Sequence, residues 1–191
     1  MEDVLSQAAL IVRQGGIIIY PTDTAFGIGC RIDNHHAIDT LFSIRKRPRT
    51  QATPVLVSSK DMALDYYRDP GSTVRHFMDT YWPGQLTIIA PCKTELVYSP
   101  VRGDGETIGL RIPDHDTPVN IISHVGVPLL GPSANFHGDP TPYRFEDLNP
   151  ELVALVDYVV PGVCSVKIAS TVVDCSVNPY HIVRQGAVTI V

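Results

Sequence analysis

Long apolar runs, paired cysteine motifs and excess positive charge are all missing from this 191-residue sequence. No apolar stretch approaches the ~20 residues that a membrane-spanning helix needs, so we expect no membrane protein. The four cysteines form no C-x-x-C pair and no zinc-type Cys/His spacing, so we expect free thiols and no dedicated metal site. The net charge of −5 argues against bulk attraction to nucleic acid.

The familiar loops for phosphate binding and nucleophilic catalysis are missing as well. Neither GxxxxGK[ST] nor GxGxxG occurs, so a bound nucleotide would depend on Arg and Lys side chains and backbone amides. "GPSAN" places Ser133 after an apolar run, but not in the GxSxG context of a serine hydrolase. The acidic start "MEDVLSQAAL" lacks the basic region of a signal peptide, so a cytoplasmic location is expected.

What the sequence does contain is a succession of short strand and helix patterns. Helices are expected over residues 4–16, 34–48, 58–67, 71–82, 116–126 and 144–157, with Asn34 and serines as N-caps and a basic last turn in the second helix. Strands are expected over residues 16–20, 25–30, 53–58, 85–91, 107–113, 127–132, 158–160, 170–176 and 180–186. Early elements alternate and late ones are mostly strand, so we expect an α+β fold with an open, twisted mixed sheet and helices packed on it, as one domain over residues 1–191.

Polar side chains gather where the expected strands end, notably in "PTDT" at residues 21–24. Arg111 and Arg184 stand inside apolar runs, where an arginine is costly unless it meets an anion. That anion is either a ligand or an internal carboxylate such as Asp23 or Asp174. The basic run "RKRPR" at residues 45–49 is either a solvated helix end or a phosphate contact.

Several motifs occur together in one order: "GGIIIYPTDTAFGIGC", "KRP…TPVLV", "WPGQLT", "TIGLRIPDH", "GPSANFHGDPTP", "STVVD" and "IVRQG". From about residue 10 to residue 187 the chain thereby resembles the YrdC-like family of threonylcarbamoyl-AMP synthases. The resemblance implies a concave ligand face like that of dihydroxybutanone-phosphate synthase. It also implies a nucleotidyltransferase that joins L-threonine, bicarbonate and ATP, with Mg²⁺, into L-threonylcarbamoyladenylate and pyrophosphate for the t6A modification of tRNA. The implied partners are a tRNA-threonylcarbamoyl transferase complex and, as a further candidate, tRNA itself.

The resemblance also assigns roles to particular residues. Lys46, Arg47 and Arg111 would be catalytic, by contacting the phosphates and the amino-acid part of the substrate. The threonine and carbamate site would comprise Thr24, Ser58, Arg111, Gly131 and Ser170. The ATP site would comprise Arg47, Thr53, Thr107, Ser133, Asn135, Thr141 and Arg184.

The sequence departs from the family pattern at three residues and in the longer spacing between "KRP" and "TPVLV". Phe26 replaces the common Tyr of the first motif, Gln85 replaces the common Pro after "WPG", and Lys167 is added before "STVVD". Two other functions therefore stay open at this point. One is an RNA-binding module without adenylyl transfer, with "RKRPR" as its contact surface. The other is carbamoyl-adenylate formation, as in hydrogenase-maturation proteins, although the chain lacks their acylphosphatase and zinc-finger segments.

Overall fold

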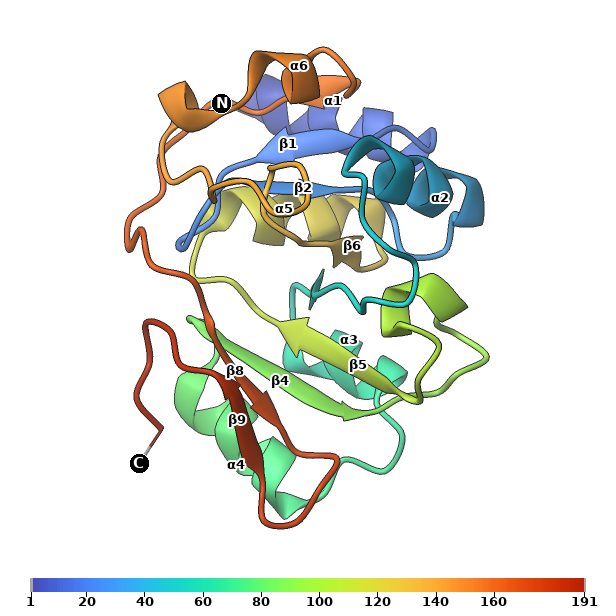
Figure 1. Ribbon diagram of the computed structural model, residues 1–191, viewed down its shortest axis with the longest axis vertical. Helices are drawn as coiled ribbons and strands as arrows, with labels where there is room; N and C mark the ends of the chain where they lie inside the picture. Colours follow the sequence, from blue (N-terminus) through green and yellow to red (C-terminus); the bar gives the residue numbers. More distant parts are fainter. Residues whose placement is uncertain (1, 191) are drawn as a thin grey trace.

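The computed structural model describes residues 2–190, and its elements follow the expected pattern closely (Figure 1). The helices are α1 (Glu2–Arg13), α2 (His35–Ile44), α3 (Lys60–Tyr66), α4 (Ser72–Tyr81), α5 (Asp116–Val125) and α6 (Pro150–Val153), with 3-10 turns η1 (Ser99–Arg102) and η2 (Phe145–Asp147). The strands are β1 (Ile18–Tyr20), β2 (Gly27–Gly29), β3 (Val55–Leu56), β4 (Leu86–Pro91), β5 (Thr107–Arg111), β6 (Leu129–Leu130), β7 (Tyr158–Val159), β8 (Thr171–Asp174) and β9 (His181–Arg184).

Helix ends show which local signals in the sequence were informative. The Asn34 side chain accepts from the backbone N–H of Ala37 and caps α2, as predicted. Ser59 caps α3 in the same way, but α4 begins after Gly71 without a side-chain cap, so the serine cap expected there is wrong. The basic last turn is also wrong, because α2 ends at Ile44 and the basic run follows it.

The expected mixed sheet is confirmed, but it is divided in two. A three-stranded sheet has the order β2-β1-β7, and a six-stranded sheet has the order β6-β3-β5-β4-β8-β9. In the larger sheet β3 runs parallel to β5 and β4 parallel to β8, whereas the other neighbours are antiparallel. Single bridges, Gly27 to Ser133 and Arg31 to Leu129, join the two sheets where β2 passes the β6 region.

A glycine makes this junction possible. A Cβ atom at Gly29 would lie 1.9 Å from the carbonyl oxygen of Leu130, far inside van der Waals contact. The two backbones therefore approach each other only because position 29 has no side chain. This close approach brings the loop between β1 and β2 alongside the segment that leaves β6, and both segments line the site described below.

The smaller sheet and most of the larger sheet lie in opposite halves of the molecule, with β6 between them, and the two sheets share one core (Figure 1). Figure 1 shows the smaller sheet below α1 and α6 in the upper half, and β4, β5, β8 and β9 with α3 and α4 in the lower half. One cluster of buried apolar side chains includes Ile19 and Ile28 of the smaller sheet and Ile88 and Leu110 of the larger one. Each such side chain contributes roughly 1.5–3 kcal/mol when fully buried, so the core ties the halves together. Among residues 2–190, no helix has the length and hydropathy to cross a membrane.

Candidate functional site

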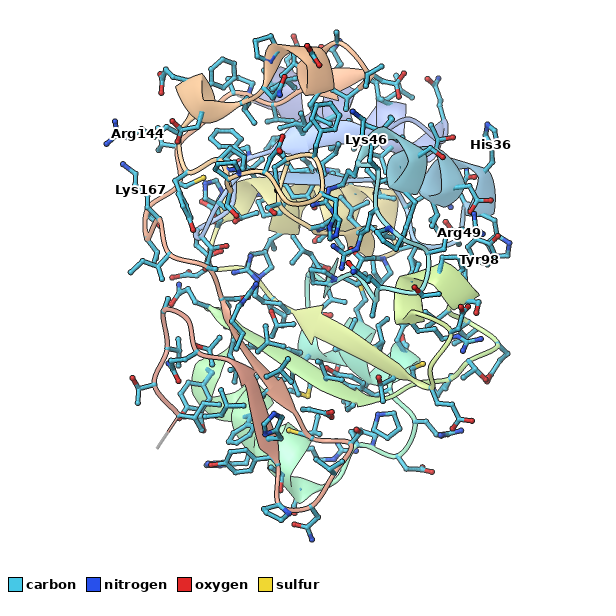
Figure 2. The ribbon with its side chains drawn as sticks, viewed as in Figure 1. His36, Lys46, Arg49, Tyr98, Arg144 and Lys167 are labelled. Atoms are coloured by element: carbon cyan, nitrogen blue, oxygen red, sulfur yellow. The ribbon has the colours of Figure 1, made fainter. Side chains whose placement is uncertain are left out.

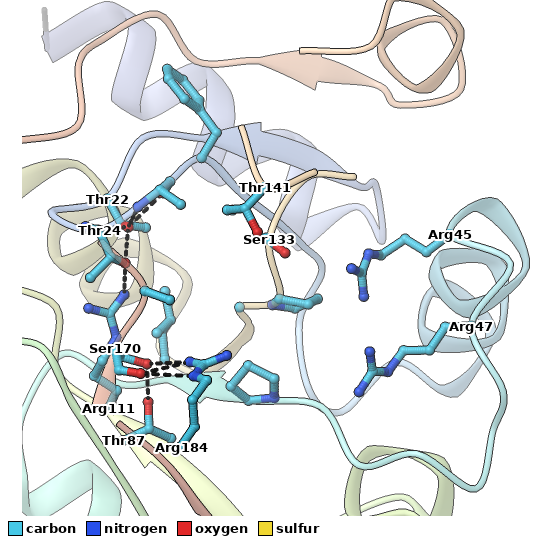
Figure 3. Close-up of a pocket in the computed structure, with 18 residues that line it drawn as sticks. Thr22, Thr24, Arg45, Arg47, Thr87, Arg111, Ser133, Thr141, Ser170 and Arg184 are labelled. Carbon is cyan, nitrogen blue, oxygen red and sulfur yellow. Dashed lines mark hydrogen bonds between the residues drawn. The ribbon is translucent and has the colours of Figure 1, made fainter. Parts of the chain in front are cut away.

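A cavity of about 190 Å³ is lined from both sheets (Figure 3). Its walls come from the β1–β2 loop, the loop after α2, the segment that leaves β6 and the facing ends of β5, β8 and β9. The lining residues are Thr22, Thr24, Ala25, Phe26, Gly27, Arg45, Arg47, Pro54, Leu56, Thr87, Arg111, Gly131, Pro132, Ser133, Thr141, Ala169, Ser170 and Arg184.

A second, larger cavity of about 510 Å³ adjoins the first over the six-stranded sheet. It has more apolar walls, including Ile89, Val172 and Val183, together with Thr53 and Thr107. The residues that line both cavities are Arg47, Pro54, Thr87, Ser170 and Arg184. We call the smaller space the inner chamber, the larger one the outer chamber and these shared residues the common wall.

The polar interruption between β1 and β2 forms a tight turn that supplies one end of the inner chamber. The Thr22 hydroxyl accepts from the backbone N–H groups of Thr24 and Ala25 at 3.2 and 3.1 Å, and donates to the Ala25 carbonyl at 2.7 Å. This arrangement satisfies the backbone locally, as Ser and Thr hydroxyls do in turns. It leaves the Thr24 side chain directed at Arg111, whose Nη2 donates to its hydroxyl at 3.1 Å.

Arg111 is paired with an internal carboxylate, one of the alternatives that the sequence left open. Its Nη1 lies 2.8 Å from Oδ1 of Asp23, and the two side chains are 6% and 1% exposed. The other Asp23 oxygen, Oδ2, accepts from Nε2 of Gln85 at 2.9 Å. Removal of one partner of such a buried pair leaves an uncompensated charge, which is strongly destabilising. Arg111 nevertheless also lines the inner chamber, so the pairing does not withdraw it from the site.

Arg184 is placed differently, because its partners are uncharged. Its Nε and Nη2 donate to the Ser170 carbonyl at 3.0 and 2.9 Å, and Nη2 also reaches the Ser170 hydroxyl at 3.1 Å. That hydroxyl lies 2.9 Å from the hydroxyl of Thr87 (Figure 3). Burial lowers the pKa of Arg184, yet a guanidinium keeps its charge at neutral pH. The arginine therefore brings a full positive charge to the common wall.

Arg45 and Arg47 form the opposite end of the inner chamber. Arg45 is 3% exposed and donates from Nε to the Asn135 carbonyl at 3.1 Å, but its Nη1 has no hydrogen-bond partner within residues 2–190. Burial, with a smaller effect of Arg47, lowers the pKa of Arg45 to about 10. The side chain of Arg47 donates to the backbone carbonyls of Gln51 and Ala52. Neither guanidinium forms an ion pair with a carboxylate among residues 2–190, so this end is suited to a multiply charged anion.

The structure brings most of the sequence-predicted site residues together. Those that line the inner chamber are Thr24, Arg47, Arg111, Gly131, Ser133, Thr141, Ser170 and Arg184. Thr53 and Thr107 line the outer chamber, and the buried Thr53 hydroxyl has no partner among the described residues. Oxygen and nitrogen atoms left unpaired at a cavity wall are typical of a ligand site.

Three predicted site residues lie outside both chambers. Lys46 has a left-handed backbone, with φ of 53°, and its exposed ammonium lies 4.6 Å from the centre of the Phe136 ring (Figure 2). The Ser58 hydroxyl faces the sulfur of Met62 at 3.8 Å. The Asn135 amide donates to the carbonyls of Phe136 and Asp139, so it braces the loop that carries Ser133.

Among the polar and charged side chains that line the inner chamber, sequence reasoning missed Thr22, Arg45 and Thr87. Arg45 belongs to the basic run that the sequence singled out, but the position where α2 ends decides which cation of that run faces inward. Of the three departures from the family pattern, Phe26 lines the inner chamber and Gln85 contacts Asp23. Lys167 lies away from both chambers, beside Cys164 at a separate pocket of about 210 Å³.

The cysteines are free, and Cys30, Cys92 and Cys164 are buried. Burial raises the pKa of Cys30 to about 12 and that of Cys175 to about 11, and it also raises the pKa values of Cys92 and Cys164. These thiols therefore stay protonated near neutral pH and are poor nucleophiles. Within residues 2–190, no group of three or more His, Cys, Asp or Glu side chains is placed to hold a metal ion.

Comparisons with known proteins identify relatives by sequence. A family model labelled Sua5_yciO_yrdC and described as "Telomere recombination" matches residues 10–186. A Bacillus subtilis protein named threonylcarbamoyl-AMP synthase is 29% identical over 97% of this chain, which spans only 54% of that protein.

Solved structures show the same fold. Pyrococcus abyssi Sua5 in complex with L-threonine superimposes with a TM-score of 0.91 at 24% identity, over 95% of this chain and 54% of that one. Escherichia coli YciO gives a TM-score of 0.86 at 26% identity, over 97% and 90% of the two chains. The family match, the relatives and the shared fold together establish that this chain belongs to the Sua5/YciO/YrdC family.

Proposed function

We propose that the protein is a threonylcarbamoyl-AMP synthase, a nucleotidyltransferase that converts L-threonine, bicarbonate and ATP into L-threonylcarbamoyladenylate and pyrophosphate. The observation that carries the proposal is the convergence of Arg45, Arg47, Arg111 and Arg184 on one cavity. Within the described part of the chain, Arg111 alone of these four forms an ion pair with a carboxylate. All the substrates of this reaction carry anionic groups. Support also comes from the name of the Bacillus subtilis relative and from the L-threonine complex of the Pyrococcus abyssi neighbour.

The inner chamber would receive the amino acid. Its volume of about 190 Å³ suits a molecule of threonine's size, and Arg111 offers a planar donor group that matches a carboxylate. Thr24 and Ser170 would supply hydroxyls beside it, and Leu56 an apolar surface for the substrate methyl. Gly131 is required here, because a Cβ at that position would lie 2.5 Å from Cγ of Leu56.

The outer chamber would receive the nucleoside of ATP, with the triphosphate directed toward Arg45 and Arg47. The apolar walls of this chamber suit a base, and the Thr53 and Thr107 hydroxyls suit a ribose or a phosphate oxygen. Ser133 and Thr141 lie on the inner-chamber wall, where phosphate oxygens would arrive. Mg²⁺ would enter with ATP, bound by phosphate oxygens and water, since the chamber walls carry guanidinium and hydroxyl groups instead of carboxylates.

The chemistry needs positioning more than it needs a reactive side chain. The threonine amine adds to bicarbonate-derived CO₂ and loses a proton to give a carbamate. A carbamate oxygen then attacks the α-phosphorus of ATP, and the bond to the β-phosphate oxygen breaks as pyrophosphate leaves. Because both steps crowd anions, the preorganised cations of Arg45, Arg47 and Arg184 would lower the barrier electrostatically. The product would serve the t6A modification of tRNA through a threonylcarbamoyl transferase complex.

The test is pyrophosphate release measured with purified protein and Mg²⁺, with each substrate omitted in turn. We expect release only when ATP, L-threonine and bicarbonate are present together. Release that does not depend on threonine, or ATP that stays intact in the complete mixture, would overturn the assignment. Intact ATP together with retention of an RNA probe would favour the alternative of an RNA-binding module without adenylyl transfer.

A further inference from the structure

The side chain of Gln85 makes one contact that bears on the site, although Gln85 lines neither chamber. Its Nε2 donates to Oδ2 of Asp23 at 2.9 Å. The backbone around it is tightly fixed, because its carbonyl accepts from Thr171 at 2.9 Å and the preceding Gly84 donates to Ile112 at 2.9 Å. The amide is thus aimed at Asp23 from a rigid position immediately before β4.

Asp23 is shared between two donors, one for each carboxylate oxygen. Oδ1 accepts from Nη1 of Arg111 at 2.8 Å, and Oδ2 accepts from Gln85. An arginine and a carboxylate with no other partners prefer a bidentate contact, with two parallel hydrogen bonds. The Gln85 amide holds Oδ2 on its own side of the carboxylate, so Asp23 keeps the orientation in which Arg111 meets Oδ1 alone and the contact stays monodentate.

Because the contact with Asp23 is monodentate, Nη2 of Arg111 is free to point toward the Thr24 end of the inner chamber. Its Nη2 is not committed to Asp23 and instead donates to the Thr24 hydroxyl at 3.1 Å. Without the Gln85 amide, Oδ2 would be a buried carboxylate oxygen with no donor, which is costly. The least costly repair is for the Asp23 carboxylate to rotate and take both nitrogens of Arg111, which would turn the guanidinium away from Thr24.

We propose that Gln85 is a positioning residue that occupies one oxygen of Asp23 and thereby keeps Nη2 of Arg111 available for the carboxylate of the amino-acid substrate. This inference rests on the proposed function, since it concerns the threonine end of the same site. It gives a role to Gln85, where the resembling family commonly has a proline that offers no side-chain donor. The groups that face Asp23 here are the Arg111 guanidinium and the Gln85 amide, with Ser165 and Val166 bonded to its backbone carbonyl.

The test is Gln85→Met, which keeps the length of the side chain but removes the donor. We expect the KM for L-threonine to rise about tenfold, while kcat and the KM for ATP change less than about twofold, because ground-state binding of one substrate is what weakens. Gln85→Glu keeps the shape, offers no donor and brings a second carboxylate toward Arg111, so its threonine KM should rise further. Gln14 is exposed and lies outside both chambers, so Gln14→Met is the matched control. Its kcat and both KM values should equal those of the parent.

A structural readout separates this inference from the proposed function. A crystal structure of Gln85→Met should show both Asp23 oxygens facing Arg111, with the Nη2 contact to Thr24 lost. An unchanged Arg111–Thr24 contact in that structure would overturn the positioning role, as would an unchanged threonine KM in an active variant. If the parent shows no threonine-dependent pyrophosphate release, the proposed function fails. The variant structure still decides whether Gln85 controls Arg111.

Discussion

Both ends of the inner chamber carry buried arginines, but the two ends differ in whether the protein supplies a carboxylate partner. At one end Arg111 is neutralised by Asp23 at 2.8 Å, and Gln85 completes the carboxylate's hydrogen bonds. At the other end Arg45 is equally buried, beside Arg47, and one of its nitrogens has no partner among residues 2–190. At the first end, the charged groups are paired within the protein itself. At the second end, a buried nitrogen of Arg45 has no acceptor among the described residues, and a ligand could supply one.

The difference indicates which part of the chamber is built for which charge. A paired arginine adds little net potential, so it suits a substrate group of single charge that is recognised mainly by hydrogen-bond geometry. Unpaired arginines generate a strong positive potential and suit a polyanion such as a triphosphate. The cost of burying the Arg45 charge falls on the free protein, and under the proposed function the binding of an anion would offset it. Stability and binding should therefore respond in opposite directions at the two ends.

The largest effect is expected from Arg111→Met. This change leaves the Asp23 carboxylate buried and unpaired, so the free energy of unfolding should fall by about 3–5 kcal/mol. Chemical denaturation followed by circular dichroism measures this loss. The double variant Asp23→Asn/Arg111→Met removes both charges and should recover part of the stability. A single variant as stable as the parent would mean that the pair is not the structural element described here.

Arg45→Met should do the reverse. Pyrophosphate release should fall about a hundredfold, in line with the loss of one preorganised charge contact. The unfolding free energy of the ligand-free protein should stay equal or rise, because a buried unpaired charge has gone. Melting temperatures with and without pyrophosphate check both effects, since only the parent should gain stability from the ligand.

Lys46→Met is the control for this prediction. The Lys46 ammonium is exposed and lies over Phe136, outside both chambers, so its removal should leave pyrophosphate release within about twofold of the parent, as surface changes usually do. If Lys46→Met were the more damaging of the two variants, the inward direction assigned to Arg45 would be wrong. The catalytic role that the sequence resemblance implies for Lys46 would then be supported.

A smaller effect is expected at the common wall from Thr87→Val. The change keeps the shape of the side chain and removes the hydroxyl 2.9 Å from that of Ser170. The loss of one neutral hydrogen bond costs about 1 kcal/mol, which corresponds to roughly fivefold in kcat/KM. Thr87→Ser should restore most of the activity. Equal activity of the Val and Ser variants would show that Ser170 is positioned by Arg184 alone.

The smallest effect is expected from Cys164→Ser, at the sulfur that lies near Asp23. Burial, with a smaller effect of Asp23, raises the pKa of this thiol, so no thiolate forms near neutral pH. The pH profile of pyrophosphate release should match that of the parent from about pH 6 to about pH 8.5, because a thiol whose pKa is raised by burial stays protonated where a free thiol would begin to ionise. A shifted profile would mean that the Cys164 sulfur ionises and takes part in the reaction at the Asp23 end. That end would then not be the charge-paired, unreactive one described above.

The buried thiols also predict how stability changes in alkali. Burial raises the pKa of Cys30 from 9.0 to about 12, so the folded protein keeps a proton that the unfolded chain loses. The contribution of Cys30 to stability is therefore present below pH 9 and is lost as the pH rises toward 12. Cys30→Ala should reduce the pH dependence of unfolding in that range. An unchanged slope would contradict the direction of the shift.

Much of the fold could be predicted from the sequence because local signals carry it. Asn34 as a cap, Gly126 at the end of α5 with φ of 83° and the short β-branched runs all act within a few residues of one another. The junction between the two sheets could not be predicted in this way. It depends on the contact of Gly29 with Leu130, residues far apart in the chain, and nothing in either local sequence indicates it.

The site residues divide in the same way into those that local sequence predicts and those that depend on tertiary contacts. Strand-end polar residues such as Thr24 and Ser170 were identified because strand ends are visible in the sequence. The choice between Arg45 and Lys46 was not visible, since it depends on where α2 ends and on the left-handed backbone of Lys46. The partner of Arg111 was equally open, because Asp23 lies 88 positions away and only the fold selects it over Asp174.

The common wall has a consequence for how two ligands would influence each other. Arg47, Thr87, Ser170 and Arg184 face both chambers, so a molecule in one chamber touches the same side chains as a molecule in the other. Their binding constants are therefore thermodynamically coupled, and the factor by which either ligand changes the other's affinity must be identical in both directions. A double titration, each ligand measured in the absence and the presence of the other, reports that factor as heterotropic cooperativity. Negative cooperativity would indicate that the two ligands compete for the same charged side chains. Positive cooperativity would indicate that one ligand orders the common wall and thereby favours binding of the other.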